Sequence, residues 1–305
     1  MSPIGSVSPP VATNDALARG RVRASYIPDL LIDARRIANN VIAGWHGRRK
    51  RGIGENFWQF RPYVEGEAMS RIDWRRSARD DHQLYVRDRE WEAAHTVWLW
   101  ADPSPSMLYQ STLAGVSKES RALVLILAVA ELLSRGGERI AWPGLTDPFT
   151  ARNGAERIAA ILTHAAEIPA RPDLATIRRF SDIVIVSDFL DPVDEMITRL
   201  DVLARHGVRA HLIEVADPAE ERFPFSGRTE FRDPESDAKY TAGRAEQFGE
   251  DYRNLYLARR EELAGWCRRI GWSYTVSHTD RPASEALVKV HMAMTMGSGR
   301  GAGVR

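Results

Sequence analysis

The sequence predicts an α/β protein with a mostly parallel sheet flanked by helices, preceded by a small β-containing extension. Two observations support this class. From about residue 96 onward, short strand-like runs alternate with longer stretches of helical periodicity, and the runs at 97–101 and 183–186 are unbroken and apolar. An unbroken apolar run bounded by turn residues is typical of a strand buried on both faces, as in parallel sheets. Regular alternation with helices favours βαβ units.

Five short segments are predicted to be strands. They cover residues 97–101, 139–142, 182–187, 210–215 and 273–277. Helices are expected where apolar residues recur at helical spacing. They cover residues 26–45, 118–134, 156–166, 193–206 and 244–269. The second helix is apolar nearly all round, which predicts that it is buried against the sheet.

The chain is expected to divide into four segments. Residues 1–24 form a flexible lead-in, and residues 25–92 form a helix plus a β-containing extension packed on the main domain. The α/β domain covers residues 93–280. Residues 281–305 form a C-terminal segment that ends in a glycine-rich tail. A length of 305 residues is ample for one such core and an appendage.

Composition places the chain among globular proteins, with 44% hydrophobic and 27% charged residues and a net charge of +1. Its longest apolar run, residues 122–130, is far shorter than the roughly twenty residues of a membrane span. We therefore expect no membrane span and a cytoplasmic location. The single cysteine, Cys267, excludes an intramolecular disulfide and is expected to be a buried thiol.

A basic cluster at residues 48–51 raises nucleic-acid binding as one alternative function. The aromatic or helix-turn-helix context of nucleic-acid-binding modules is missing around it. We therefore expect no nucleic-acid partner.

Polar side chains follow two of the predicted strands and form the candidate site. Asp102, Ser104 and Ser106 come after the first strand, and Asp188 follows the third. Ligands of open α/β sheets bind beyond the carboxyl ends of the strands, where both turns would lie. Alternate residues of an extended chain point the same way, and the two intervening prolines stiffen the loop. These four residues are the predicted metal ligands.

Carboxylate and hydroxyl oxygens suit a hard cation such as Mg²⁺, which uses few protein ligands and keeps several waters. An adhesion-type site would leave one position open for a carboxylate of another molecule. The alternative is a magnesium-dependent hydrolase, similar to phosphoesterases, that uses Asp102 and Asp188. No catalytic base, phosphate loop or nucleophile elbow accompanies the motif, so no catalytic residue is assigned and no enzyme is expected.

The segment before the first strand carries a longer pattern. It comprises Gly-Glu-Asn-Phe at 54–57, Phe-Arg-Pro-Tyr-Val-Glu-Gly-Glu at 60–67, Arg-Ile-Asp-Trp at 71–74 and Ala-Arg at 78–79. This pattern resembles the hallmark of the bacterial domain-of-unknown-function family number 58. Asp102, Ser104 and Ser106 match the metal-ion-dependent adhesion motif of von Willebrand factor A-like domains, which have a Rossmann-like fold.

The resemblance implies a protein-interaction module that works with a MoxR-type AAA+ ATPase in maturation or chaperone-like remodelling of client proteins. The client itself is unknown. Many family members carry N-terminal membrane helices that this sequence lacks. The family's third metal loop has a threonine where this chain has Pro172, so Mg²⁺ binding is expected to be weak or absent unless Asp173 or Thr176 substitutes.

Overall fold

The computed structural model describes residues 13–46, 59–64, 69, 72, 74–80, 83–88, 95–165, 168–169, 171–236 and 238–298. The chain separates into two compact units. The larger unit comprises Met1–Ala43 and His95–Arg305, and the smaller one comprises Gly44–Ala94.

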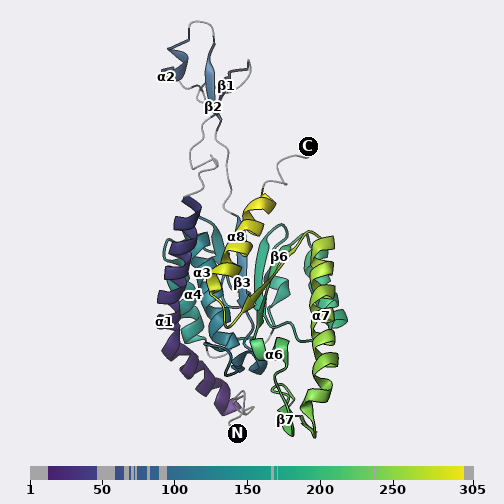
Figure 1. Ribbon diagram of the computed structural model, residues 1–305. Helices are drawn as coiled ribbons and strands as arrows, with labels where there is room; N and C mark the ends of the chain where they lie inside the picture. The colour runs from purple at the N-terminus through teal and green to yellow at the C-terminus, as the bar shows by residue number, and fades with distance from the viewer. Residues whose placement is uncertain are drawn as a thin grey trace. The chain divides into compact units, whose positions relative to one another are not determined.

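A five-stranded sheet forms the centre of the larger unit (Figure 1). Its strands are β3 (Thr96–Ala101), β4 (Arg139–Ala141), β5 (Asp182–Ser187), β6 (Arg209–Ala216) and β9 (Ser273–His278). They lie in the order β4-β3-β5-β6-β9, and every neighbouring pair is parallel. The predicted α/β class with helices flanking a parallel sheet is confirmed, and all five strands lie at the predicted places within a few residues.

The strand order contains a topological switch point. From β3 the chain crosses to β4 at one edge, and it then returns past β3 to place β5 on the other side. A crevice opens at the carboxyl ends of the two strands at such a point, and it is the usual ligand position in this class of sheet. The loops after β3 and β5 are those that carry the predicted site residues.

Helices cover both faces of the sheet, with α3 and α8 on one side and α7 on the other (Figure 1). The helices of this unit are α1 (Thr13–His46), α3 (Lys118–Arg135), α4 (Gly154–His164), α5 (Val193–Arg205), α6 (Pro218–Arg222), α7 (Gly249–Arg269) and α8 (Ala283–Ser298). Short 3₁₀ turns lie at η2 (Pro105–Leu108), η3 (Leu174–Thr176) and η4 (Ala245–Phe248). Almost all of α3 is buried, as its apolar sequence predicted.

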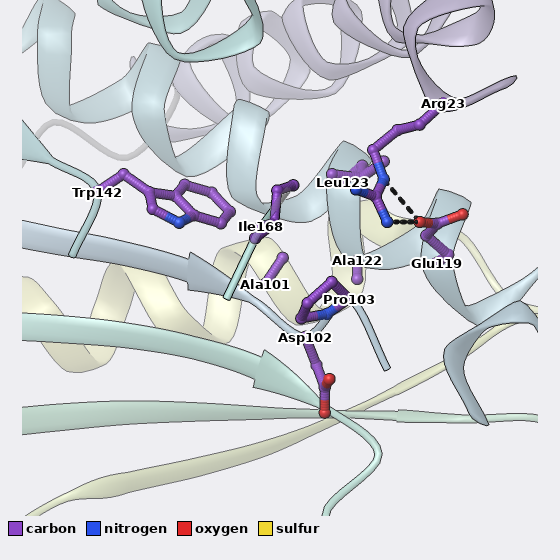
Figure 2. Close-up of a pocket in the computed structure, with 9 residues that line it drawn as sticks. All are labelled: Arg23, Ala101, Asp102, Pro103, Glu119, Ala122, Leu123, Trp142 and Ile168. Atoms are coloured by element: carbon purple, nitrogen blue, oxygen red, sulfur yellow. Dashed lines mark hydrogen bonds and ion pairs between the residues drawn. The ribbon is translucent and has the colours of Figure 1, made fainter. Parts of the chain in front are cut away.

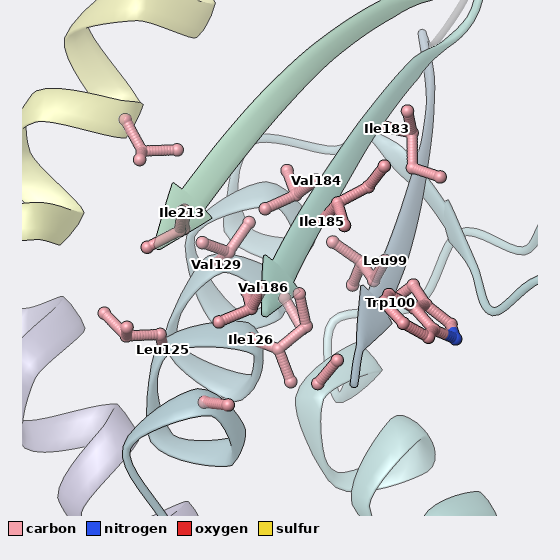
Figure 3. Close-up of a cluster of buried hydrophobic side chains, with 14 of the residues drawn as sticks. Leu99, Trp100, Leu125, Ile126, Val129, Ile183, Val184, Ile185, Val186 and Ile213 are labelled. Atoms are coloured by element: carbon pink, nitrogen blue, oxygen red, sulfur yellow. The ribbon is translucent and has the colours of Figure 1, made fainter. Parts of the chain in front are cut away.

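The core lies between α3 and the central strands (Figure 3). Leu125 and Ile126 of α3 are fully buried, as are Leu99 of β3 and Val184 of β5. Burial of each such side chain contributes about 1.5–3 kcal/mol. The core therefore holds β3 and β5 firmly, and with them the starting points of both polar loops. Cys267 is buried as predicted.

Both ends of the chain are more helical than the sequence suggested. Of the residues 1–24 predicted to form a flexible lead-in, residues 13–24 belong to α1, while residues 1–12 lie outside the described part. Residues 16–19 are strong helix formers, and this local propensity outweighs the glycine and proline nearby. Near the C-terminus, α8 covers Ala283–Ser298, because Ala286, Leu287 and Val290 are buried in the core.

An antiparallel hairpin that the sequence did not reveal follows α6. It comprises β7 (Thr229–Arg232) and β8 (Lys239–Ala242). Aromatic rings pack its base: the ring centroid of Phe223 lies 5.1 Å from that of Phe225, 5.6 Å from that of Phe231 and 4.9 Å from that of Tyr252. This cluster joins the hairpin to the ends of α6 and α7.

The smaller unit contains strand β1 (Gln59–Pro62), which pairs antiparallel with β2 (Tyr85–Asp88), and the short helix α2 (Trp74–Ser77). Within it, the backbone N–H of Tyr85 donates to Ser77 Oγ over 2.9 Å, and the Tyr85 hydroxyl donates to Asp80 over 2.6 Å. The predicted extension grouped residues 25–45 with these strands. In the structure α1 lies with the larger unit up to Ala43, because Ile27, Ala34 and Ala38 are buried in its core.

Candidate functional site

Asp102 follows β3 directly and is fixed at both carboxylate oxygens. Its Oδ2 accepts a hydrogen bond from the Ser187 hydroxyl over 2.6 Å, and its Oδ1 accepts one from the Ser104 backbone N–H over 2.8 Å. Figure 2 shows this carboxylate pointing away from Leu123 and Trp142, toward the ends of the neighbouring strands. Burial raises the pKa of Asp102, and Asp188 adds to this effect while the bond from Ser187 opposes it.

Ser104 and Ser106 present their hydroxyl groups side by side. Ser104 is extended before the 3₁₀ turn η2, and Pro105 occupies the first position of that turn. The two Oγ atoms are 3.1 Å apart, close enough to share a hydrogen bond. The structure therefore brings together the three predicted oxygen donors of this loop.

Asp188, the fourth predicted ligand, is engaged by a lysine. The Lys118 ammonium, at the first position of α3, donates to Asp188 Oδ2 over 2.9 Å and to Glu220 Oε1 over 2.5 Å. The Lys118 side chain is fully buried. Burial disfavours both charges, but the two carboxylates raise the pKa of Lys118, and Lys118 in turn holds the pKa of Asp188 below its usual range.

A third polar turn, after β6, completes this arrangement. Asp217 and Glu220 form a capping box at the start of α6: Asp217 Oδ1 accepts from the N–H of Ala219, and Glu220 Oε2 accepts from the N–H of Asp217. Asp217 Oδ2 also accepts from the N–H of Ser111 over 2.9 Å. The box orients Glu220 toward Lys118.

Glu235, at the tip of the β7–β8 hairpin, reaches the loop after β3. Its Oε1 accepts a hydrogen bond from the Ser106 backbone N–H over 3.0 Å. Asp233 shapes the tip by accepting from the N–H of Glu235. Burial raises the pKa of Glu235, and the carboxylates of Asp102 and Asp188 raise it further. A carboxylate from a distant part of the chain therefore lies at the loop after β3, close enough to the Asp102 and Asp188 carboxylates for its pKa to respond to them.

A second buried network holds α7 against the sheet. Glu214 of β6 is fully buried and is bound by two arginines of α7. Arg260 donates to it from Nε over 2.9 Å, and Arg259 donates from Nη2 over 3.2 Å. The hydroxyls of Tyr256 and Tyr274 also donate to Glu214.

The same helix contacts the backbone of the loop after β5. Arg259 Nη1 donates to the carbonyl oxygens of Asp188 and Phe189. Phe189 has a φ of 50°, in the left-handed region that non-glycine residues seldom adopt. Arg259 therefore helps to hold the backbone from which the Asp188 side chain projects.

At the edge of this network, Glu221 accepts from Arg260 Nη1 over 2.5 Å and lies 2.8 Å from His278 Nε2. These two partners lower the pKa of Glu221 to about 2, with His278 contributing most, although burial opposes them. A lowered folded-state pKa stabilises the fold above the ordinary glutamate value of 4.5, and this contribution is lost as the pH falls toward about 2.

We therefore expect Glu221→Gln to cost about 1 kcal/mol of unfolding free energy at neutral pH, after allowance for solvent screening of this half-buried pair. The difference from wild type should vanish as the pH falls from 4.5 to about 2. Urea denaturation followed by circular dichroism across this range measures it. Glu262→Gln, at an exposed position of α7, is the control. A difference independent of pH would contradict the assignment.

The donor set fits a divalent cation only in part. Adjacent ligands of an octahedral Mg²⁺ lie about 3 Å apart, which the Ser104 and Ser106 hydroxyls match. Asp188, however, is already neutralised by Lys118. In the third loop, the Thr176 hydroxyl donates to the Asp173 carbonyl, and the Asp173 carboxylate caps η3. Across the described residues, no group of three or more His, Cys, Asp or Glu side chains is arranged to hold a metal ion. The residues present do not fit a tightly held Mg²⁺.

Three residues at this site escaped the sequence prediction. Lys118 and Glu220 both had a signal: Lys118 opens a helix that is otherwise apolar, and Glu220 belongs to a polar turn after a predicted strand, like Asp102 and Asp188. Glu235 had none, because it lies on a hairpin 129 residues away from Ser106 in the sequence.

The family model described as "Protein of unknown function DUF58" matches residues 59–262, about two thirds of the chain. The chain belongs to the DUF58 family. The match starts at β1 in the smaller unit and ends within α7, so it includes Asp102, Lys118, Asp188 and Glu235. The predicted resemblance to domain-of-unknown-function family number 58 is thereby confirmed.

Relatives of this DUF58 chain occur in mycobacteria. An uncharacterized protein of Mycobacterium tuberculosis and one of Mycobacterium bovis are each 28% identical over 300 residues, which cover 90% of this chain and 92% of theirs. An uncharacterized protein of Mycobacterium avium is 32% identical over 127 residues, covering 39% of this chain and 74% of its own length.

Solved structures similar to this DUF58 chain include an aerotolerance-related membrane protein from Bacteroides fragilis, at a TM-score of 0.38 and 14% identity. The similarity covers 67% of this chain and all of that one. An uncharacterized membrane spanning protein from Vibrio fischeri is similar at a TM-score of 0.18 and 13% identity, over 66% of this chain and 96% of that one.

These neighbours correct the predicted cytoplasmic location, because both carry the description of membrane proteins. That prediction rested on the lack of a long apolar run, which does not determine the compartment of a protein. Among the helices that the structure describes, none combines the length and apolar character needed to cross a bilayer.

Proposed function

We propose that this chain is a non-enzymatic protein-interaction module whose larger unit is von Willebrand factor A-like. Its docking surface is the loop with Asp102, Ser104 and Ser106 together with the Asp188 loop. The docked group is an acidic side chain of the partner. The family resemblance favours a MoxR-type AAA+ ATPase as that partner, acting in maturation or remodelling of client proteins.

The observation that supports this proposal best is the position of Glu235. Its carboxylate is bound by the Ser106 N–H, although Asp102 and Asp188 raise its pKa. Because this loop binds one carboxylate next to two others, its geometry also suits a carboxylate of a partner. The donor is the Ser106 backbone N–H, and its hydrogen bond to a carboxylate is charge-assisted.

The position of the site in the fold supports the same function. The two loops lie at the carboxyl ends of β3 and β5, at the switch point of the sheet. The strands beneath them are fixed by the core, so the loops can be rigid while their tips face a partner. Asp102 accepts two hydrogen bonds and Asp188 is paired with Lys118. Both carboxylates therefore already have partners, which does not favour a role as a general base.

Affinity capture with the tagged full chain tests this proposal. We expect a MoxR-type AAA+ ATPase from the native lysate to bind the wild-type chain. It should bind Ser106→Pro at least about tenfold more weakly, because proline lacks the backbone N–H that would donate to the partner carboxylate. Ser226→Pro, at an exposed position outside the site, is the control. Thermal midpoints of all proteins are compared first.

Two results would contradict the proposal. Equal capture by wild type and Ser106→Pro at matched stability would place docking elsewhere on the chain. Hydrolysis of p-nitrophenyl phosphate by the purified chain, lost in Asp102→Asn, would instead favour the magnesium-dependent hydrolase.

A further inference from the structure

Lys118 occupies a place that disfavours a lysine on two counts. Its side chain is fully buried, and an unpaired buried ammonium is strongly destabilising. It is also the first residue of α3, where the positive end of the helix dipole disfavours a cation. The charge at this position therefore requires compensation from its surroundings.

The surroundings are built to compensate it. Asp188 Oδ2 and Glu220 Oε1 accept from the ammonium, and the Tyr109 ring centroid lies 5.9 Å from Nζ. The Lys118 N–H donates to the carbonyl of Tyr109, which fixes the start of the helix beside the loop. Asp188 comes from the loop after β5 and Glu220 from the turn after β6. One ammonium thus joins three chain segments at the carboxyl edge of the sheet.

In the described part of the chain, Lys118 is the one cation that forms an ion pair with Asp188 and Glu220. The Asp188 carboxylate lies close enough to Asp102, Glu220 and Glu235 to raise the pKa of each, in addition to the effect of burial. A cluster of this kind needs a positive charge from outside or from within the chain. Lys118 supplies this positive charge at Asp188, the residue predicted to be a ligand of the divalent ion.

We propose that Lys118 is a built-in cation: its ammonium replaces the divalent ion at the Asp188 side of this site, so the two loops keep their arrangement without Mg²⁺. The inference concerns the loops that the proposed function uses for docking. Its test needs no partner, so its failure and a failure of docking are separate results.

The experiment compares the wild-type full chain with Lys118→Met, using thermal unfolding in EDTA and in millimolar MgCl₂, and calorimetric titration with Mg²⁺ alone. We expect the wild-type midpoint to be the same in both buffers, with no saturable Mg²⁺ binding. Lys118→Met should unfold on the order of 10 °C lower in EDTA, because two buried carboxylates lose their partner. MgCl₂ should recover at least half of this loss.

Lys239→Met is the matched control, because Lys239 is exposed on the hairpin and its only ion pair in the described residues is with Glu230 at 3.8 Å. The thermal midpoint of Lys239→Met should be the same in EDTA and in MgCl₂. The triple variant Lys118→Met, Asp188→Asn, Glu220→Gln removes all three charges and should also be insensitive to Mg²⁺.

Saturable Mg²⁺ binding by the wild-type chain that Asp188→Asn abolishes would overturn the proposal. So would a folded Lys118→Met that is destabilised equally in both buffers, since the lysine would then be an ordinary buried ion-pair partner. If Lys118→Met does not fold in EDTA, refolding in MgCl₂ decides: recovery supports the built-in cation, and failure in both buffers overturns it.

Discussion

We expect Glu214→Gln to lower the free energy of unfolding by about 3–5 kcal/mol, the cost of removing one partner from a buried ion-pair network. Glu214 is fully buried and is bound by Arg259 and Arg260. Glutamine keeps the shape of the side chain but removes the negative charge that pairs with two partly buried guanidinium groups. Urea denaturation followed by tryptophan fluorescence and circular dichroism measures the loss.

Glu230→Gln is the control for this prediction. Glu230 is exposed on the hairpin, and the substitution removes the same negative charge. It should change the free energy of unfolding by less than about 0.5 kcal/mol. A loss below about 1 kcal/mol for Glu214→Gln would show that the network relaxes or admits water, and that packing rather than charge holds α7 on the sheet.

A gain of function is expected at Glu235, and this prediction rests on the proposed docking function. Glu235 competes with any partner carboxylate for the Ser106 N–H. Glu235→Ala should therefore raise the affinity for the MoxR-type partner about tenfold, which corresponds to about 1.4 kcal/mol for a partly exposed, charge-assisted hydrogen bond. Biolayer interferometry with the purified ATPase measures the change.

Glu230→Ala controls for the loss of charge from the same hairpin and should leave the affinity within a factor of two of the wild-type value. Weaker binding by Glu235→Ala would mean that the partner needs the hairpin tip in place. In that case Glu235 would belong to the docking surface instead of competing for it.

The parts of the fold that the sequence predicted are those with a local periodic signal. The strands at 97–101 and 182–187 have unbroken apolar runs at 97–101 and 183–186, and α3 is apolar nearly all round, so their burial can be inferred directly. The predicted site residues followed from these strands, because the topology brings the carboxyl ends of neighbouring parallel strands together.

The missing parts depend on contacts between distant segments. The hairpin strands are four residues each and only partly buried, so they leave little periodic pattern to detect. Glu235 contacts Ser106 from the tip of a hairpin whose base packs in an aromatic cluster, and the sequence shows neither contact. The role of Lys118 likewise depends on Asp188 and Glu220, which lie 70 and 102 residues away in the sequence.

The hydrogen bonds from Arg259 to the Asp188 and Phe189 carbonyls link the motion of α7 to that of the loop after β5. The adjacent Arg260 donates to the buried Glu214 of β6, so α7 is bound both to the sheet and to the loop. Any displacement of α7 relative to the sheet would therefore also displace the backbone of the Asp188 loop, so the position of this helix and the position of the loop are coupled.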